Sequence, residues 1–177
     1  PVGPLTVVAS FEALTDGEDY IEGGGGNDTI FGGLGQDDIV GGSSNFFSLN
    51  ARDQRPDGSD IVFGGAGTQI GRNNEALATG TTATQRHARD ADTIVGDNGD
   101  IVRIVGISGD DLIDNNPSRL YVSFNYDNYD PTKIIVRGVS LLDYTPGGPD
   151  FSDAAASDIG GNDEVHGETG DDTVYLG

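Results

Sequence analysis

Residues 23–31 read GGGGNDTIF and residues 32–40 read GGLGQDDIV, so two nonamers of one pattern follow each other without a gap. Both fit G-G-x-G-x-D-x-U-x, in which U is a large aliphatic residue, and we number its positions from one to nine. Partial copies keep the aspartate at position six and the aliphatic residue at position eight. These copies lie at 14–22, 57–63, 91–95, 106–114, 158–166 and 167–175.

The composition of the 177-residue chain excludes several classes of protein. Asp and Glu number 30 against 9 Lys and Arg, which gives a net charge of −21 that phosphate would repel, so a nucleic-acid partner is excluded. There is no cysteine for a disulfide or thiolate site, and no apolar run of the roughly 20 residues that a membrane helix needs. The 29 glycines and the acidic charge are typical of disorder, but both follow the repeat and therefore indicate ordered turns.

The residue types of the repeat favour a hard cation. Glycine permits positive φ and close approach of backbone carbonyls, and calcium takes six to eight carbonyl or carboxylate oxygens at about 2.3–2.6 Å. The carboxylates at position six are the candidate ligands. They are Asp19, Asp28, Asp37, Asp60, Asp92, Asp111, Asp163 and Asp172.

The repeat resembles the RTX (repeats-in-toxin, hemolysin-type) calcium-binding proteins of bacteria. The resemblance is strong over 14–42 and 158–177 and interrupted over 57–67 and 91–114. It implies an all-β fold, a right-handed parallel β-roll or solenoid with two nonamers per turn. It also implies that carbonyls at positions two and four complete each calcium site. Here these belong to Gly24, Gly26, Gly33, Gly35, Gly65 and Gly67.

Two nonamers per turn place aspartates 18 residues apart in one stack. We therefore expect Asp19 to meet Asp37, Asp28 to meet Asp60 across an insertion, and Asp163 to meet an aspartate beyond residue 177. The position-eight residues should form a narrow core between two sheets. They are Ile21, Ile30, Ile39, Val62, Ile94, Ile113, Val165 and Val174.

The repeats divide the chain into four parts: a lead-in strand at 1–13, a β-roll at 14–114 with insertions at 43–56 and 68–90, an insertion at 115–157, and resumed repeats at 158–177 that we expect to continue. Period-two alternation at 120–126 and 134–142, around the turn DNYDPT, predicts a β-hairpin. Residues 96–105 place Ile101 where aspartate is expected, so this copy should be poor in metal ligands.

The basic residues gather between the repeats, where two interpretations stay open. Five of the nine lie in 50–90, beside His87. They could form a patch for an anionic partner, or they could pair with the acidic roll. The tyrosines of 115–157 could likewise bind a glycan or protein ligand, or pack at a sheet edge.

The sequence favours one function over two alternatives. Stacked carboxylates without a counter-charge repel, so the chain should fold on binding roughly four to eight calcium ions. The resemblance implies part of a larger bacterial exoprotein that leaves the cell by type I secretion and folds outside. The alternatives are a surface adhesion or ligand-binding module that uses 115–157, and the non-catalytic part of a secreted enzyme. The chain contains no H-E-x-x-H or G-x-S-x-G motif, so we expect no catalysis by this segment and leave oligomeric state open.

Overall fold

The computed structural model describes residues 6–13, 15–68, 89–104, 123–124, 134–143 and 159–176. In these ranges the chain is all-β, apart from one 3-10 turn, η1 (Arg52–Gln54). The strands are β1 (Tyr20–Glu22), β2 (Thr29–Phe31), β3 (Asp38–Val40), β4 (Ile61–Phe63), β5 (Thr93–Val95), β6 (Gly99–Arg103), β7 (Ser123–Phe124), β8 (Ile134–Ile135), β9 (Arg137–Leu141), β10 (Glu164–His166) and β11 (Thr173–Tyr175). Within the same ranges no helix is long and apolar enough to cross a membrane.

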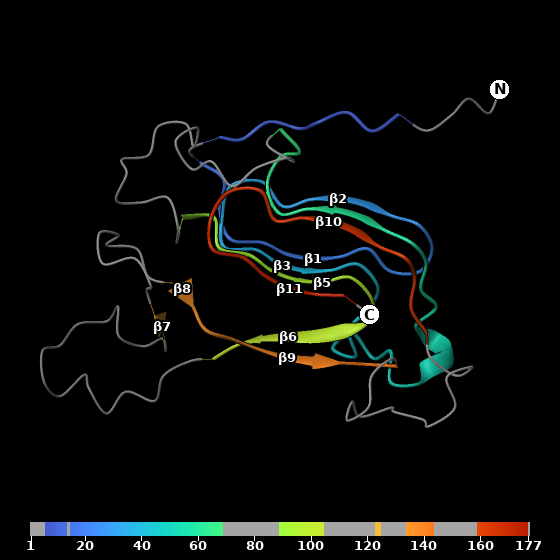
Figure 1. Ribbon diagram of the computed structural model, residues 1–177. Helices are drawn as coiled ribbons and strands as arrows, with labels where there is room; N and C mark the ends of the chain where they lie inside the picture. Colours follow the sequence, from blue (N-terminus) through green and yellow to red (C-terminus); the bar gives the residue numbers. More distant parts are fainter. Residues whose placement is uncertain are drawn as a thin grey trace, which may run out of the picture.

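The repeat strands form two parallel sheets. One sheet has the order β1-β3-β5-β11, which we call sheet A, and the other has the order β10-β4-β2, which we call sheet B. Successive copies of the repeat alternate between the two sheets, so each sheet receives every second copy until the insertions intervene. Figure 1 shows sheet B above sheet A, with the turns that join them at both ends of the strands. The predicted all-β class with parallel sheets is confirmed.

Each repeat strand holds only three residues, and the middle one points into the space between the sheets. Ile30 and Val62 of sheet B pack against Ile39 and Ile94 of sheet A, and all four are buried. Partly buried Ile21 and Val165 extend this core at its edges. The remaining predicted core residues differ: Val174 is 41 % exposed on the edge strand β11, and Ile113 lies outside the described residues.

The pairing register measures how much chain separates neighbouring turns. The offset is 18 between Asp19 and Asp37, and it rises to 32 between Asp28 and Asp60, an excess equal to the length of the predicted insertion 43–56. Between Asp37 and Asp92 the offset is 55, an excess equal to the two insertions 43–56 and 68–90 together.

The last interruption is longer than the predicted insertion at 115–157. Strand β5 pairs directly with β11, and the offset there is 80, so residues 96–157 all intervene between successive turns. Part of this interruption returns as the antiparallel pair β6–β9, which Figure 1 shows below sheet A. Strands β7 and β8 also pair antiparallel, in the part of the chain for which the sequence predicts a hairpin.

The β6–β9 ribbon covers the outer face of sheet A. Ile101 packs with Val40 and Val95 in a second buried cluster, which Val139 and Leu141 border. Ile101 therefore stands at the aspartate position because this copy leaves the roll and supplies an apolar contact instead.

Ion pairs join the ribbon to the roll and the 43–56 insertion to the end of the ribbon. The Asp38 carboxylate accepts hydrogen bonds from Arg103 Nε at 2.7 Å and Arg137 Nε at 2.8 Å, one from each ribbon strand. Arg55 forms a bidentate pair with Asp143 at 2.7 and 2.8 Å, and both side chains are at most 1 % exposed.

The arginines of 50–90 that the structure describes bond to acceptors within the chain. Arg52 donates to the Asp143 carbonyl, and Arg89 donates to the carbonyls of Leu34 and Asp16. Of these described bonds, only those of Arg89 reach the roll, and they go to carbonyls and not carboxylates, whereas Arg52 and Arg55 bond to Asp143 of the 115–157 insertion. Arg72, Arg86 and His87 lie outside the described residues.

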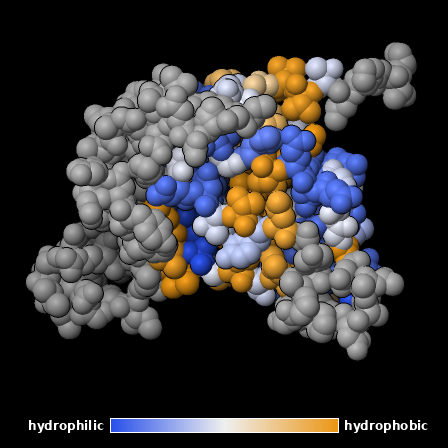
Figure 2. Space-filling view, in the orientation of Figure 1, coloured by the Kyte–Doolittle hydropathy of each residue, from blue (hydrophilic) through white to orange (hydrophobic). Residues whose placement is uncertain are grey.

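The two ends of the roll differ in what covers them. Residues 6–13 lie along the first turns and bond through Ser10 N to the Ala66 carbonyl, but they form no strand, unlike the predicted lead-in strand. At the other end, Figure 2 shows a hydrophobic band down the middle of the face, flanked by hydrophilic turns. Val174, Tyr175 and Leu176 of this end are 39–54 % exposed.

Candidate metal sites

One row of turns leads into sheet A and places four aspartates in a ladder. The Asp19 amide donates to Asp37 Oδ1 at 2.7 Å, and the Asp37 amide donates to Asp92 Oδ1 at 2.9 Å. The Asp92 amide donates in turn to Asp172 Oδ1 at 3.0 Å. Each carboxylate therefore reaches back to the amide of the same repeat position in the preceding turn.

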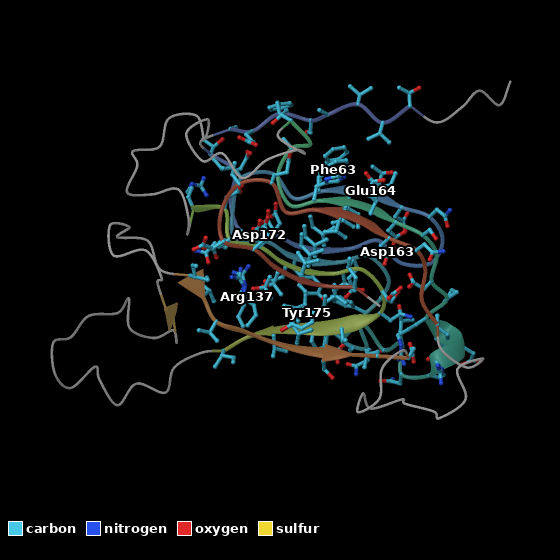
Figure 3. The ribbon with its side chains drawn as sticks, viewed as in Figure 1. Phe63, Arg137, Asp163, Glu164, Asp172 and Tyr175 are labelled. Carbon is cyan, nitrogen blue, oxygen red and sulfur yellow. The ribbon has the colours of Figure 1, made fainter. Side chains whose placement is uncertain are left out.

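The opposite row of turns leads into sheet B and holds a second ladder. The Asp28 amide donates to Asp60 Oδ1 at 2.8 Å, and the Asp60 amide donates to Asp163 Oδ1 at 3.0 Å. The sequence placed Asp163 against an aspartate beyond residue 177 and missed its contact with Asp60, which lies 103 residues earlier. Figure 3 shows Asp163 and Asp172 at opposite ends of the strands, one in each row.

The second oxygen of these carboxylates, Oδ2, indicates a metal site. In four of the ladder aspartates Oδ2 is buried and has no hydrogen-bond partner, and these are Asp28, Asp37, Asp60 and Asp92. Buried polar atoms without a partner are rare in folded proteins and each requires a physical explanation. A row of such oxygens, all at one repeat position, fits a row of bound cations.

Backbone carbonyls lie beside these oxygens. A methyl group on Gly32 would overlap the Gly64 carbonyl oxygen and lie 2.6 Å from Asp37 Oδ2. The same relation, in which a position-one glycine faces a position-six Oδ2 and a carbonyl of the next turn, holds for Gly23, Gly32, Gly41 and Gly64. Carboxylate and carbonyl oxygens are the ligands that calcium prefers, so the chemistry of the site fits this ion.

The predicted carbonyl donors fall into two groups. Glycines at φ between 77° and 116° have a backbone that residues with a side chain rarely adopt, and these are Gly24, Gly26, Gly33 and Gly67. Gly35 and Gly65 do not have this backbone and are required for space instead. A methyl group on Gly35 would overlap the Gly17 carbonyl, and one on Gly65 would lie 2.5 Å from Glu168 Oε2.

Burial changes the acidity of the ladder carboxyls in the calcium-free fold. It raises the pKa of Asp37 to about 6 and the pKa of Asp172 to about 8, and it raises that of Asp92 well above the ordinary value. Ladder neighbours Asp37 and Asp172 add to the rise at Asp92, whereas Asp90 and Asp171 add to the rise at Asp172. A divalent cation would reverse this effect, because it stabilises the ionised form.

Two further observations limit which atoms could bind a cation in the turns. No three Asp, Glu, His or Cys side chains of the described residues form a group that could hold a metal ion by themselves. Any cation in the turns must therefore take several of its oxygens from the backbone. Asp111, the remaining predicted ligand, lies outside the described residues.

Three buried aspartates in the turns fall outside the position-six pattern; the sequence allowed an oxygen from Asp97 or Asn98 but missed Asp57 and Asp90. Asp90 accepts hydrogen bonds from the Gly35 amide at 3.1 Å and from the Thr169 hydroxyl, and burial raises its pKa to about 7. Asp57 and Asp97 lie in the other row, and burial together with Asp97 raises the pKa of Asp57 to about 8. Their position beside the edges of the insertions is the only signal that the sequence carries.

Comparison with known proteins supports the same interpretation of the repeats. The model of the RTX calcium-binding nonapeptide repeat matches residues 15–45 and 160–177, with four copies. No curated protein and no solved structure matches the chain. The match covers both ends of the ladders.

Proposed function

We propose that this chain, an RTX repeat protein, is a module that folds when calcium binds between the turns of a right-handed β-roll with two nonamers per turn. RTX repeats bind calcium, and the row of buried Oδ2 atoms without partners is the observation that supports calcium-dependent folding here. The ladders bring aspartates of successive turns into contact, so in the calcium-free fold their negative charges repel. Calcium removes this repulsion, and its binding free energy becomes folding free energy.

The net charge of −21 sets the scale of the calcium requirement. Four to eight ions, as the two ladders suggest, would supply about eight to sixteen positive charges, since each calcium ion carries two. The acidic composition is then the charge of the protein part alone, and the loaded module would carry an ordinary surface charge.

The calcium requirement bears on where the module acts. Free calcium is scarce inside cells and reaches millimolar concentrations outside. A chain that folds only with calcium would stay unfolded during export and fold afterwards, so we place the module in an extracellular, secreted protein. We assign no catalysis to this segment, because its repeated aspartates are accounted for by the ladders.

The test is folding at defined calcium. Circular dichroism of the dialysed chain in excess chelator should show little strand, and millimolar calcium should restore the strand signal. Sodium chloride at matched ionic strength and magnesium are the controls, because screening alone would let either replace calcium. A chain equally folded in chelator would contradict the proposal.

Ligand binding is a second candidate, which one cavity favours. A hollow of about 420 Å³ beside β1 is lined by Tyr20, Phe46 and Phe47 together with Arg103. The Tyr20 ring centroid lies 6.3 Å from that of Phe46 and 6.4 Å from that of Phe47. Exposed aromatic rings beside charged groups suit a sugar, whose apolar face stacks while its hydroxyls hydrogen-bond.

This cavity uses the 43–56 insertion, whereas the sequence suggested 115–157 for ligand binding. A glycan array with the calcium-loaded chain tests it. Phe47→Ala should abolish any binding that Val8→Ala retains, since Val8 is 74 % exposed and does not line the cavity. Binding unaffected by Phe47→Ala would exclude this function for the cavity.

A further inference from the structure

Two aspartates outside the ladders occupy turn positions that the repeat gives to other residues. Gly41 and Gly42 begin one turn, and after the insertion the chain resumes at Asp57 and ends that turn at Asp60. The next turn of the same row begins with Gly96 and Asp97, whose carbonyl accepts the Gly42 amide at 3.3 Å. Asp57 thus stands at position three and Asp97 at position two, where the two complete nonamers carry glycine or leucine.

Both carboxylates are buried without enough partners. Neither oxygen of Asp57 has a hydrogen-bond partner, and Oδ2 of Asp97 has none. The Asp97 residue is 3 % exposed, and its Oδ1 accepts the Gly161 amide at 2.6 Å. Burial and the neighbouring Asp97 raise the pKa of Asp57, and the Gly58 backbone N–H lowers it, so two acidic groups share this place and Gly58 is only a weak donor to Asp57.

Oxygen atoms converge on this place from several backbone segments. A methyl group on Gly42 would lie 2.9 Å from Asp57 Oδ1 and 2.5 Å from Asn98 Oδ1. A methyl group on Gly160 would lie 2.8 and 3.1 Å from the two oxygens of Asp97. The missing side chains of these glycines leave the room that the carboxylates occupy.

The surroundings hold the two turns in place. The Asn98 side chain donates to the Arg55 carbonyl and to the Asp143 carboxylate, so the buried Arg55–Asp143 pair supports the segment next to Asp97. The arginine itself is bound to Asp143 and to the Leu49 carbonyl. These bonds orient the Arg55 guanidinium towards Asp143 and Leu49.

We propose that Asp57 and Asp97 bind a calcium ion in a site of their own composition, which uses side-chain carboxylates where the nonamer uses backbone carbonyls. The inference rests on the proposed calcium-dependent folding and extends it. Calcium affinity rises with the number of charged ligands. Removal of both charges should therefore weaken or abolish binding at this site.

The test compares calcium stoichiometry in matched variants. The double variant Asp57→Asn with Asp97→Asn keeps an acceptor oxygen for the Gly161 amide and removes only charge. Asp53→Asn is the control for charge loss, because Asp53 is an exposed residue of η1 and its substitution removes one nearby negative charge without changing the buried pair. Competition with a chromophoric calcium chelator, together with equilibrium dialysis, should show one ion fewer per molecule for the double variant, or one site at least tenfold weaker. The control should match the wild type.

The other outcomes are also decisive. A double variant with the wild-type number and affinity of ions would overturn the inference while leaving calcium-dependent folding intact. If the double variant failed to fold at any calcium concentration, the two single variants would be measured, and wild-type binding by both would overturn it. Wild-type folding without calcium would instead defeat the proposed function. Defects confined to Asp→Ala variants, with Asn variants normal, would show a hydrogen-bonding role and also overturn the inference.

Discussion

At the residue scale, the glycine at position one decides how closely two turns approach. Gly32 faces the Gly64 carbonyl and Asp37 Oδ2 with no room for a methyl group, although its backbone is not left-handed. Its role is therefore space next to the proposed metal ligands and not conformational freedom. Gly17 lies in the preceding turn with nothing within 4 Å of the place a methyl group would take.

These two glycines give a matched prediction. Gly32→Ala should lower the free energy of unfolding of the calcium-loaded chain by about 1–3 kcal/mol, the usual cost of overpacking, and should weaken calcium binding. Gly17→Ala should be neutral or stabilise by up to about 1 kcal/mol, because alanine restricts the unfolded chain. Urea unfolding in saturating calcium measures both. Equal effects of the two substitutions would refute the close approach at Gly32.

At the scale of elements, Asp38 joins the roll to the ribbon. The carboxylate is 4 % exposed and binds Arg103 and Arg137, whereas Glu18 binds the same Arg103 with a side chain that is 45 % exposed. A buried charge that loses its partner is costly, while an exposed ion pair contributes little. One arginine thus offers a buried and an exposed partner for comparison.

Substitution of either partner should separate these two contributions. Asp38→Asn should destabilise the loaded chain by about 3–5 kcal/mol and raise hydrogen exchange in β6 and β9. Glu18→Gln should cost less than about 1 kcal/mol and leave exchange in the ribbon unchanged. If both variants exchanged like the wild type, Asp38 would not fasten the ribbon.

The sequence predicts a strand or contact well when a single nonamer specifies it, and poorly when the contact spans an interruption of the repeat. The nonamer specifies a turn and a three-residue strand within itself, so β2 and β3, and the contact of Asp19 with Asp37, follow from the sequence. The contact of Asp60 with Asp163 depends on where the chain re-enters the roll after a long interruption, and no local pattern predicts that position. The β6–β9 pairing likewise arises from an apolar face that exists only after sheet A has formed.

At the scale of the whole molecule, the ladders make stability depend on pH in opposite ways with and without calcium. In the calcium-free fold the pKa of Asp37 is raised to about 6 and that of Asp172 to about 8, above the value of roughly 3.9 in an unfolded chain. The calcium-free fold then binds more protons than the unfolded chain, so its stability increases as the pH falls. In the loaded fold the carboxylates are held ionised, so its stability decreases only as the pH falls through and below the unfolded value of roughly 3.9.

We predict that pH affects the calcium-stripped and the calcium-loaded protein differently. Calcium-stripped protein in sodium sulfate, which favours compact states, should gain strand signal between pH 8 and pH 5. Protein in millimolar calcium should keep its stability to urea over this interval and lose it only below about pH 4, where the unfolded carboxyls take up protons. Circular dichroism follows both samples, and a stripped protein that loses strand signal on acidification would contradict the raised pKa values.

The ladder bonds give the array a polarity. Every link runs from the amide of one turn to the carboxylate of the following turn, from Asp19 to Asp172 and from Asp28 to Asp163. Among the described residues, the Asp19 and Asp28 carboxylates accept no ladder bond at one end, and the Asp163 and Asp172 amides donate none at the other. Two such arrays are complementary when they stack head to tail and mismatched when they stack head to head. A row of identical aspartates thus gives the array a direction, because one end of each ladder carries an unused acceptor and the other an unused donor.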